Sequence, residues 1–226
     1  RSCLGYDPRQ PEPGLEQLGV RPRLGYPERY TQDEYERLVG MFKERGEEGL
    51  WSALEYFLKA IIPVAEEEQI LMGLHPDDPS FNVRGRPRIV KHGAALQRVV
   101  DIVPSASNGI TFCPGSLATN RHNDVMDIAQ KLWPHFVFCH FRNIRFLAEE
   151  DFDGEWAFLE TYHEDEKGLV PIPALMKLLY DKGCAVPYRA DHAPGMYGHD
   201  ANFGYGLVAR AQGLSYLQGI LRGLGA

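Results

Sequence analysis

Short apolar runs that alternate with amphipathic segments constrain the fold of this chain more than any other feature. Each run is too short for a helix and is typical of a strand buried on both faces. The segments between the runs carry apolar residues at helical spacing. This alternation predicts a parallel sheet with right-handed helical crossovers. The predicted strands cover residues 70–75, 110–113, 136–140 and 184–188.

The number of strands indicates half of a barrel. An open sheet of four such apolar strands would expose its edges or one apolar face to solvent, which is unfavourable. The predicted fold class is therefore an α/β (β/α)8 TIM barrel, of which this chain shows about the C-terminal half. We expect the other half either to precede residue 1 or to hide in residues 1–30, and we favour the first. A chain that truly began at residue 1 could not close the barrel alone.

Two segments are expected to be irregular. Residues 1–30 hold five of the sixteen prolines and show no sustained periodicity, so we predict a proline-rich arm or loop. Residues 144–168 are acidic and are also predicted to form a loop. Residues 31–226 as a whole are predicted to form the C-terminal part of a single catalytic barrel domain.

The helices carry recognisable boundary signals. Thr31 and Glu34 form a capping box that starts the first helix. Gly46 and Gly49 are expected to interrupt it. Further helices are predicted over residues 50–68, 94–103, 123–132 and 172–182 and from residue 207 onward.

Charge and cysteine usage exclude several functions. The net charge of −7 argues against a nucleic-acid or anionic-membrane partner, because both favour a basic surface. No apolar run approaches the ~18 residues that a membrane span needs. The cysteines are far apart and form no CxxC pair, which argues against a disulfide framework. We therefore expect a reducing, cytoplasmic location. The cysteines are Cys3, Cys113, Cys139 and Cys184.

Each predicted strand ends in a residue that can bind a metal. Parallel strands place their carboxyl ends side by side, so these residues can converge without a local motif. Two imidazoles, a thiolate and a carboxylate suit Mn²⁺, Fe²⁺, Co²⁺ or Zn²⁺. The alternative is that the cysteine is a small core residue and that the histidines are ordinary hydrogen-bonding groups. The four residues are His75, Cys113, His140 and Asp191.

Residues 189–205 have the layout of an active-site segment. A strand ends in Asp191 and His192, a glycine-rich loop follows, and a helix closes the segment. Such a pair could bind a metal and move a proton. It could equally be a loop carboxylate beside a surface histidine.

Five stretches of the chain form long, ordered motifs: LHPDDP (74–79), GRPRIV (85–90), NGITFCPGS (108–116), CHFRN (139–143) and RADHAPGM with NFGY (189–205). These motifs resemble those of the mannonate dehydratase family, and the similarity spans roughly residues 26–226. That family has a barrel of the xylose-isomerase-like kind. The resemblance implies a lyase that dehydrates D-mannonate to 2-keto-3-deoxy-D-gluconate in glucuronate catabolism, with Mn²⁺ or Fe²⁺. It also implies a homodimer.

The resemblance also implies roles for single residues. It makes His75, Cys113, His140 and Asp191 the metal ligands. His192 and Tyr205 match the catalytic histidine and tyrosine of the family, and which of them removes the C2 proton stays open. The residues it implies in substrate binding are Arg142 in CHFRN and His163 in the F-x-E-x-x-H segment (158–163). Apart from the resemblance, Arg88 could bind a carboxylate through its charge, and a solvated basic loop is the alternative.

The chain departs from the family pattern at two motifs. Ala190 stands where the family usually has proline, and Pro114 where it usually has threonine. These changes leave the implied ligands intact, but they leave open a related sugar acid as the substrate. Two other functions also stay open. One is a sugar isomerase or epimerase on the same metal-binding barrel, and the other is a non-catalytic homologue.

Overall fold

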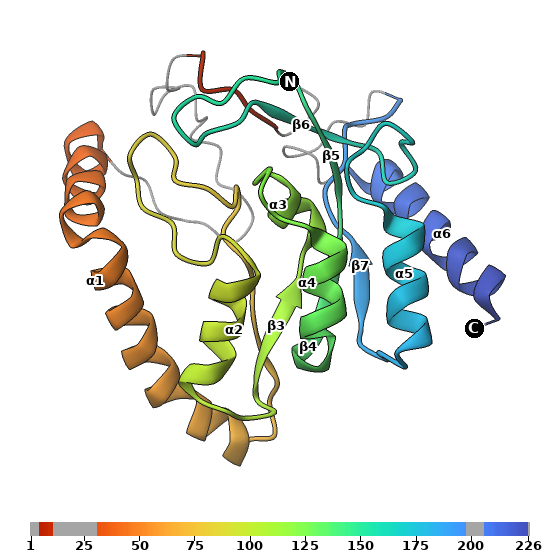
Figure 1. The fold of residues 1–226 in the computed structure, drawn as a ribbon, viewed down its shortest axis with the longest axis horizontal. Coiled ribbons are helices and arrows are strands. Elements are labelled where there is room, and N and C mark those ends of the chain that lie inside the picture. The colour runs from red at the N-terminus through yellow and green to blue at the C-terminus, as the bar shows by residue number, and fades with distance from the viewer. Residues whose placement is uncertain (1–4, 11–30, 198–205, 226) are drawn as a thin grey trace.

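The centre of the structure, a computed structural model that describes residues 5–10, 31–197 and 206–225, is a parallel sheet (Figure 1). The sheet has the order β2-β3-β4-β7, and every neighbouring pair is parallel. The carboxyl ends of the strands therefore lie along one edge. Strand order follows chain order, as it does around a barrel. The strands are β2 (Met72–Leu74), β3 (Asn108–Phe112), β4 (Phe136–Phe141) and β7 (Tyr188–Ala190).

All four predicted strands are present, with one shift. The last strand begins at Tyr188, the final residue of the predicted run. Pro187 precedes it and has no N–H to give to a ladder, although its carbonyl accepts a hydrogen bond from Cys139 N. The parallel α/β fold inferred from the alternation is confirmed, and the sheet is consistent with part of a barrel.

Helices connect the strands and pack beside them, as Figure 1 shows for α2, α4 and α5. Asp124 caps α4 by accepting hydrogen bonds from Met126 N and Asp127 N. The short helix α3 directly after β3 is an addition to the prediction, and it begins with Pro114, a residue suited to a first helical turn. The helices are α1 (Gln32–Glu67), α2 (Gly93–Ile102), α3 (Pro114–Ala118), α4 (Val125–Leu132), the 3-10 helix η1 (Trp133–His135), α5 (Ile172–Asp181) and α6 (Leu207–Leu224).

The first helix is one long element with a kink. Thr31 and Glu34 form the predicted capping box. Gly46 breaks the helical geometry with φ 64° and ψ −179°, a conformation that favours glycine, whereas Gly49 remains helical. The predicted interruption is therefore correct at Gly46 and wrong at Gly49. The second half of the helix buries Trp51, Leu58, Ile62 and Ala65.

A small antiparallel sheet corrects two predictions. Its order is β1-β6-β5, formed by β1 (Gly5–Tyr6), β5 (Asn143–Phe146) and β6 (Phe158–Thr161). Residues 144–168 are thus not simply a loop, and residues 1–30 are not irregular throughout. The strands escaped prediction because they are very short and because Arg145 and Glu160 interrupt their apolar character. In Figure 1 this sheet lies at the end of the molecule toward which β3 points.

The core lies between the parallel sheet and its helices. It includes Leu96, Val99, Ile110, Phe112 and Leu117, all fully buried. Phe112 stacks on Phe136 with ring centroids 4.5 Å apart, which joins β3 to β4. Among the residues that the structure describes, no helix combines the length and apolar character that a membrane crossing requires.

Candidate metal centre

Four chemically active side chains lie at the carboxyl edge of the parallel sheet. His75 directly follows β2, Cys113 directly follows β3, and His140 is the penultimate residue of β4. Asp191 directly follows β7. Each therefore occupies the strand end at which the sequence predicted a metal donor. The strand geometry alone brings together residues that are up to 116 positions apart.

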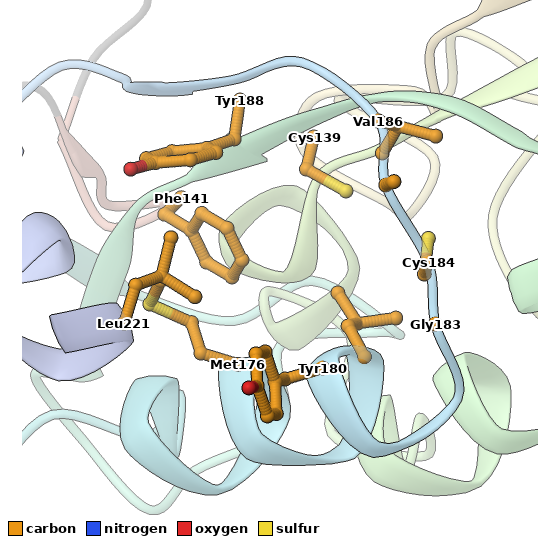
Figure 2. Close-up of a pocket in the computed structure, with 11 residues that line it drawn as sticks. Cys139, Phe141, Met176, Tyr180, Gly183, Cys184, Val186, Tyr188 and Leu221 are labelled. Atoms are coloured by element: carbon orange, nitrogen blue, oxygen red, sulfur yellow. The ribbon is translucent and has the colours of Figure 1, made fainter. Parts of the chain in front are cut away.

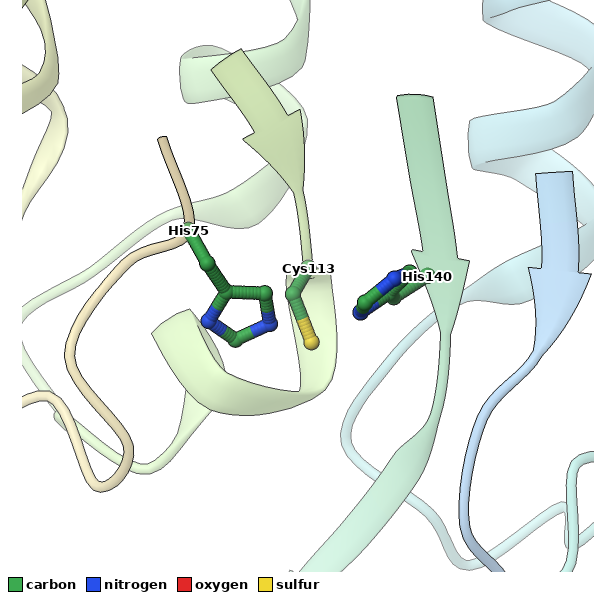
Figure 3. A group of neighbouring side chains, drawn as sticks. All are labelled: His75, Cys113 and His140. Atoms are coloured by element: carbon green, nitrogen blue, oxygen red, sulfur yellow. The ribbon is translucent and has the colours of Figure 1, made fainter. Parts of the chain in front are cut away.

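Three of these residues form a compact group that we call the donor cluster. The ligand atoms of His75, Cys113 and His140 all lie within 4.8 Å of one another. Figure 3 shows the side chains pointing toward one another from neighbouring strand ends. The two imidazole rings have centroids 5.1 Å apart. Two imidazoles and a thiol form a donor set that suits borderline divalent transition metals.

Burial keeps the donor cluster neutral. Desolvation lowers the pKa of His140 to about 4, and it also lowers the pKa of His75. Desolvation raises the pKa of Cys113 to about 12. The imidazoles are therefore in the form that binds a metal, whereas the thiol must lose its proton when a cation arrives. Ser116 Oγ lies 3.1 Å from Cys113 Sγ and holds the thiol in place.

Asp191 lies beside the donor cluster, not inside it. Arg189 Nη2 donates a hydrogen bond to Asp191 Oδ1 over 2.6 Å. Burial opposes ionisation of this carboxyl, but neighbouring His192 and Arg142 hold its pKa below the ordinary value. The structure thus brings three of the four predicted ligands together and places the fourth at the adjoining strand end. The ligand role of Asp191 stays a prediction.

A second group, which we call the charged network, adjoins the donor cluster. Arg142 is 1% exposed and donates hydrogen bonds from Nη1 to Asp78 Oδ2 (2.6 Å) and from Nη2 to Asp78 Oδ1 (2.9 Å). Its Nη1 also lies 3.2 Å from Glu160 Oε1. Glu160 in turn lies 2.7 Å from His192 Nδ1. The network consists of Asp78, Arg142, Glu160 and His192.

Pairing holds the network together. Burial alone would raise the pKa of Asp78, but the charge and hydrogen bonds of Arg142 lower it to about 2. The guanidinium pKa of Arg142 lies well above its ordinary value: burial opposes the charge, but Asp78 outweighs it. Gly115 permits the close approach of this arginine, because a Cβ at Gly115 would lie 2.7 Å from Arg142 Cβ.

The residues predicted to bind substrate lie in different surroundings. Arg88 is partly exposed and donates from Nη1 to Asp77 Oδ1 over 3.3 Å. His163 is buried, and its Nε2 hydrogen bonds to the Phe141 carbonyl over 2.8 Å. Arg142 is occupied by two protein carboxylates. Tyr205 lies outside the described residues.

Sequence reasoning missed the part that Asp78 and Glu160 play. Asp78 is 64 positions from Arg142, and Glu160 is 32 positions from His192. No local spacing rule connects such pairs. The available signals were the pair of acids after His75 and Pro76 and a single arginine placed between a strand and an asparagine.

A hollow on the other side of the sheet lacks the chemistry of a sugar-acid site. It has a volume of about 400 Å³ and lies among β4, β7, α5 and α6 (Figure 2). Cys139 and Phe141 line it, and they flank His140 along β4, so strand alternation points His140 to the opposite face. None of the lining residues carries a charge.

Parallel strands with metal donors at their carboxyl ends define a class, the metal-binding (β/α)8-barrel proteins. Within that class, the chain belongs to the D-mannonate dehydratase (UxuA) family, whose model matches residues 17–226. The family resemblance drawn from the motifs is thus confirmed.

Individual relatives agree with this assignment. A mannonate dehydratase of Enterococcus faecalis is 41% identical over 187 residues, which cover 83% of this chain and 51% of that protein. A mannonate dehydratase of Oceanobacillus iheyensis is 37% identical over 200 residues, covering 88% and 56%. The chain therefore spans about half the length of the curated relatives it matches.

Solved structures support the same fold. The mannonate dehydratase of Streptococcus suis serotype 2 has a TM-score of 0.78 at 35% identity, covering 86% of this chain and 55% of that one. A xylose isomerase domain protein from Planctomyces limnophilus has a TM-score of 0.52 at 15% identity, covering 88% and 56%. The second likeness concerns the fold alone, and together they support the predicted partial barrel.

Proposed function

We propose that this chain carries the metal centre and the proton-transfer groups of a D-mannonate dehydratase. The reaction would be the conversion of D-mannonate, or a related sugar acid, to 2-keto-3-deoxy-D-gluconate in glucuronate catabolism. The observation that carries the proposal is the donor cluster, with Asp191 and His192 at the adjoining strand end. Family membership supplies the reaction class.

The proposed cofactor is one Mn²⁺ or Fe²⁺ ion. His75, Cys113 and His140 would hold it, and Asp191 at the adjoining strand end would add a carboxylate. The fit lies in the donor chemistry, because buried neutral imidazoles are ready to bind and the thiol can supply a negative charge. Such an ion would polarise the substrate carboxylate and thereby make the C2 proton more acidic.

The chain's own residues would move the protons. Dehydration breaks the C2–H and C3–O bonds, releases water, and leaves an enol that tautomerises to the 2-keto acid. His192 stands at the end of β7 beside Asp191, where it can exchange a proton with a bound ligand. Tyr205 is the proposed partner, and the two would share the acid and base roles.

The proposed substrate contacts differ in kind. Arg88 is the more accessible arginine and can meet a substrate carboxylate, which a guanidinium binds well. Arg142 would act indirectly, because Asp78 and Glu160 already occupy its guanidinium. His163 would support the end of β4, next to His140, through its hydrogen bond to the Phe141 carbonyl. We further propose a cytoplasmic homodimer with no nucleic-acid or membrane partner, in keeping with the net charge of −7.

Turnover tests the proposal. The purified chain, loaded anaerobically with Mn²⁺, is assayed against a panel of aldonic acids for 2-keto-3-deoxy product by periodate–thiobarbiturate colour. Aldoses are assayed separately for ketose product by chromatography. We expect metal-dependent product from mannonate, with a loss of about 100-fold or more in His192→Asn and in Tyr205→Phe. Bound metal without product from any acid would refute the dehydratase. Isomerised aldose would favour the isomerase instead.

A further inference from the structure

Glu160 contacts the His192 ring on the side opposite to Asp191. Glu160 Oε1 lies 2.7 Å from His192 Nδ1, and His192 Nε2 lies 3.5 Å from Asp191 Oδ2. Glu160 belongs to β6 of the small antiparallel sheet, whereas His192 follows β7 of the parallel sheet. The antiparallel sheet therefore places the Glu160 carboxylate at the carboxyl end of the parallel sheet.

The neighbours of His192 Nδ1 decide which nitrogen carries the hydrogen. This nitrogen faces an acceptor, Glu160 Oε1, at 2.7 Å and a donor, Arg142 Nη1, at 3.4 Å. Arg142 Nη1 lies closer to two carboxylate oxygens, at 2.6 Å from Asp78 and 3.2 Å from Glu160, so its hydrogens go there. Of the two carboxylates beside the ring, Glu160 is the nearer, at 2.7 Å from Nδ1 against 3.5 Å from Nε2 to Asp191. Nδ1 therefore donates to Glu160, and Nε2 is the acceptor nitrogen of the neutral ring.

We propose that Glu160 is a positioning residue, which holds His192 in the Nδ1–H tautomer so that Nε2 is the nitrogen that exchanges the proton. The inference rests on the proposed function, because it serves the histidine named there as a catalytic group. Glu160 acts through the ring and does not touch the substrate. The arrangement follows the general rule that a functional histidine is oriented by the acceptor bound to its other nitrogen.

The rest of the charged network fixes the carboxylate. Glu160 is 3% exposed, and its backbone pairs with Ile144 in the middle of the antiparallel sheet. Arg142 supplies the opposite charge that a buried carboxylate requires. Two hydrogen bonds to Asp78 hold the guanidinium plane in turn. Buried ion pairs add little net stability, so positioning accounts for this network better than stability does.

Nitrogen-15 NMR reads the tautomer directly. Protein labelled with ¹⁵N in its histidine rings gives long-range ¹H–¹⁵N patterns that differ between the Nδ1–H and Nε2–H forms. The His192 signals are assigned as those lost in His192→Asn. Spectra are recorded over a pH series, and the tautomer is read on the alkaline plateau, where the ring signals no longer change. The measurement requires neither metal nor turnover.

We expect His192 of the unsubstituted protein in the Nδ1–H form. Glu160→Gln should lower the ratio of Nδ1–H to Nε2–H about tenfold, because an amide accepts this hydrogen bond less strongly than a carboxylate. Glu160→Leu removes the acceptor and should make Nε2–H the main form. Glu166→Gln is the matched control, since this exposed glutamate lies on the segment after β6 and should change nothing.

Two results would overturn the inference. One is an unsubstituted protein with His192 in the Nε2–H form. The other is an unchanged tautomer ratio in Glu160→Gln, which keeps the shape of the side chain and needs no rearrangement to fold. Failure of turnover would refute the proposed function and leave the tautomer assignment intact. Turnover by a protein with an Nε2–H His192 would refute this inference alone.

Discussion

The donor cluster and the charged network adjoin each other and are built in opposite ways. In the donor cluster, burial leaves every group uncharged: the pKa of His140 falls to about 4 and that of Cys113 rises to about 12. In the charged network Asp78 and Arg142 keep their charges, because their mutual hydrogen bonds lower the pKa of the carboxyl and raise that of the guanidinium. The donor cluster can bind a cation, whereas the charged network already contains one, the guanidinium of Arg142.

This difference predicts different responses to change. A neutral cluster loses little when one donor is replaced, because no charge is stranded in the interior. A paired network loses much when one member is removed, because its partners remain buried and uncompensated. Substitutions in the donor cluster should therefore lower the metal affinity strongly and the free energy of unfolding only slightly. Substitutions in the charged network should lower the free energy of unfolding strongly.

The largest expected effect is the loss of Arg142. Arg142→Met leaves the carboxylates of Asp78 and Glu160 without a counter-charge, and we expect the free energy of unfolding to fall by about 3–5 kcal/mol. Urea unfolding at pH 7 measures it. Arg145→Met, at an exposed position on β5, should change stability by about 0.5 kcal/mol or less. A cost below about 1 kcal/mol for Arg142→Met would show that the network is not paired as described.

A smaller effect concerns acidification of the metal-free protein. The folded pKa of His140 is about 4, below its unfolded value of about 6.5, so the unfolded chain binds more protons between these values. The contribution of His140 to the free energy of unfolding is fully present above about pH 6.5 and is lost as the pH drops toward 4. His75 acts in the same direction. Because His140 is partly exposed, we expect it to contribute roughly 1–2 kcal/mol.

Urea unfolding at several pH values measures this decline. His140→Asn cannot bind the extra proton, so its unfolding free energy should change less between pH 6.5 and 4. His122→Asn, at an exposed histidine, should keep the full decline. A decline of equal size in the two variants would mean that His140 is not held neutral by its surroundings.

The smallest effect should appear at still lower pH, in the charged network. The folded pKa of Asp78 is about 2, below its unfolded value of about 3.9, so its contribution is present above about pH 4 and is lost as the pH falls toward 2. The side chain is 33% exposed, so we expect about 1 kcal/mol. Asp78→Asn should make the free energy of unfolding less dependent on pH between about pH 4 and 2. The decline between pH 6.5 and 4 should stay unchanged. The opposite pattern would contradict the division between the two clusters.

The donors could be predicted from sequence because they follow a local rule. A polar residue at the end of a buried apolar strand must lie at the sheet edge, and parallel pairing brings such ends together. This reasoning located His75, Cys113 and His140 and the strands that carry them. The family motifs reached the same residues independently.

The charged network could not be predicted, because it joins the two sheets. Glu160 lies on a strand of four residues within an acidic stretch, which gives too few positions for a period to show. Its partner Arg142 lies between β4 and β5, and Asp78 lies in the loop after β2. Only the folded chain reveals that these charges neutralise one another.

The central claim is that the donor cluster binds a divalent cation, and an anaerobic Co²⁺ titration tests it most directly. We expect one equivalent of Co²⁺ to give a thiolate-to-cobalt absorption band, with affinity rising about tenfold per pH unit near neutrality because Cys113 releases a proton. Cys113→Ser should abolish the band, Cys184→Ser should retain it, and Mn²⁺ should compete for the site. No band, or the same band in Cys113→Ser, would contradict the account.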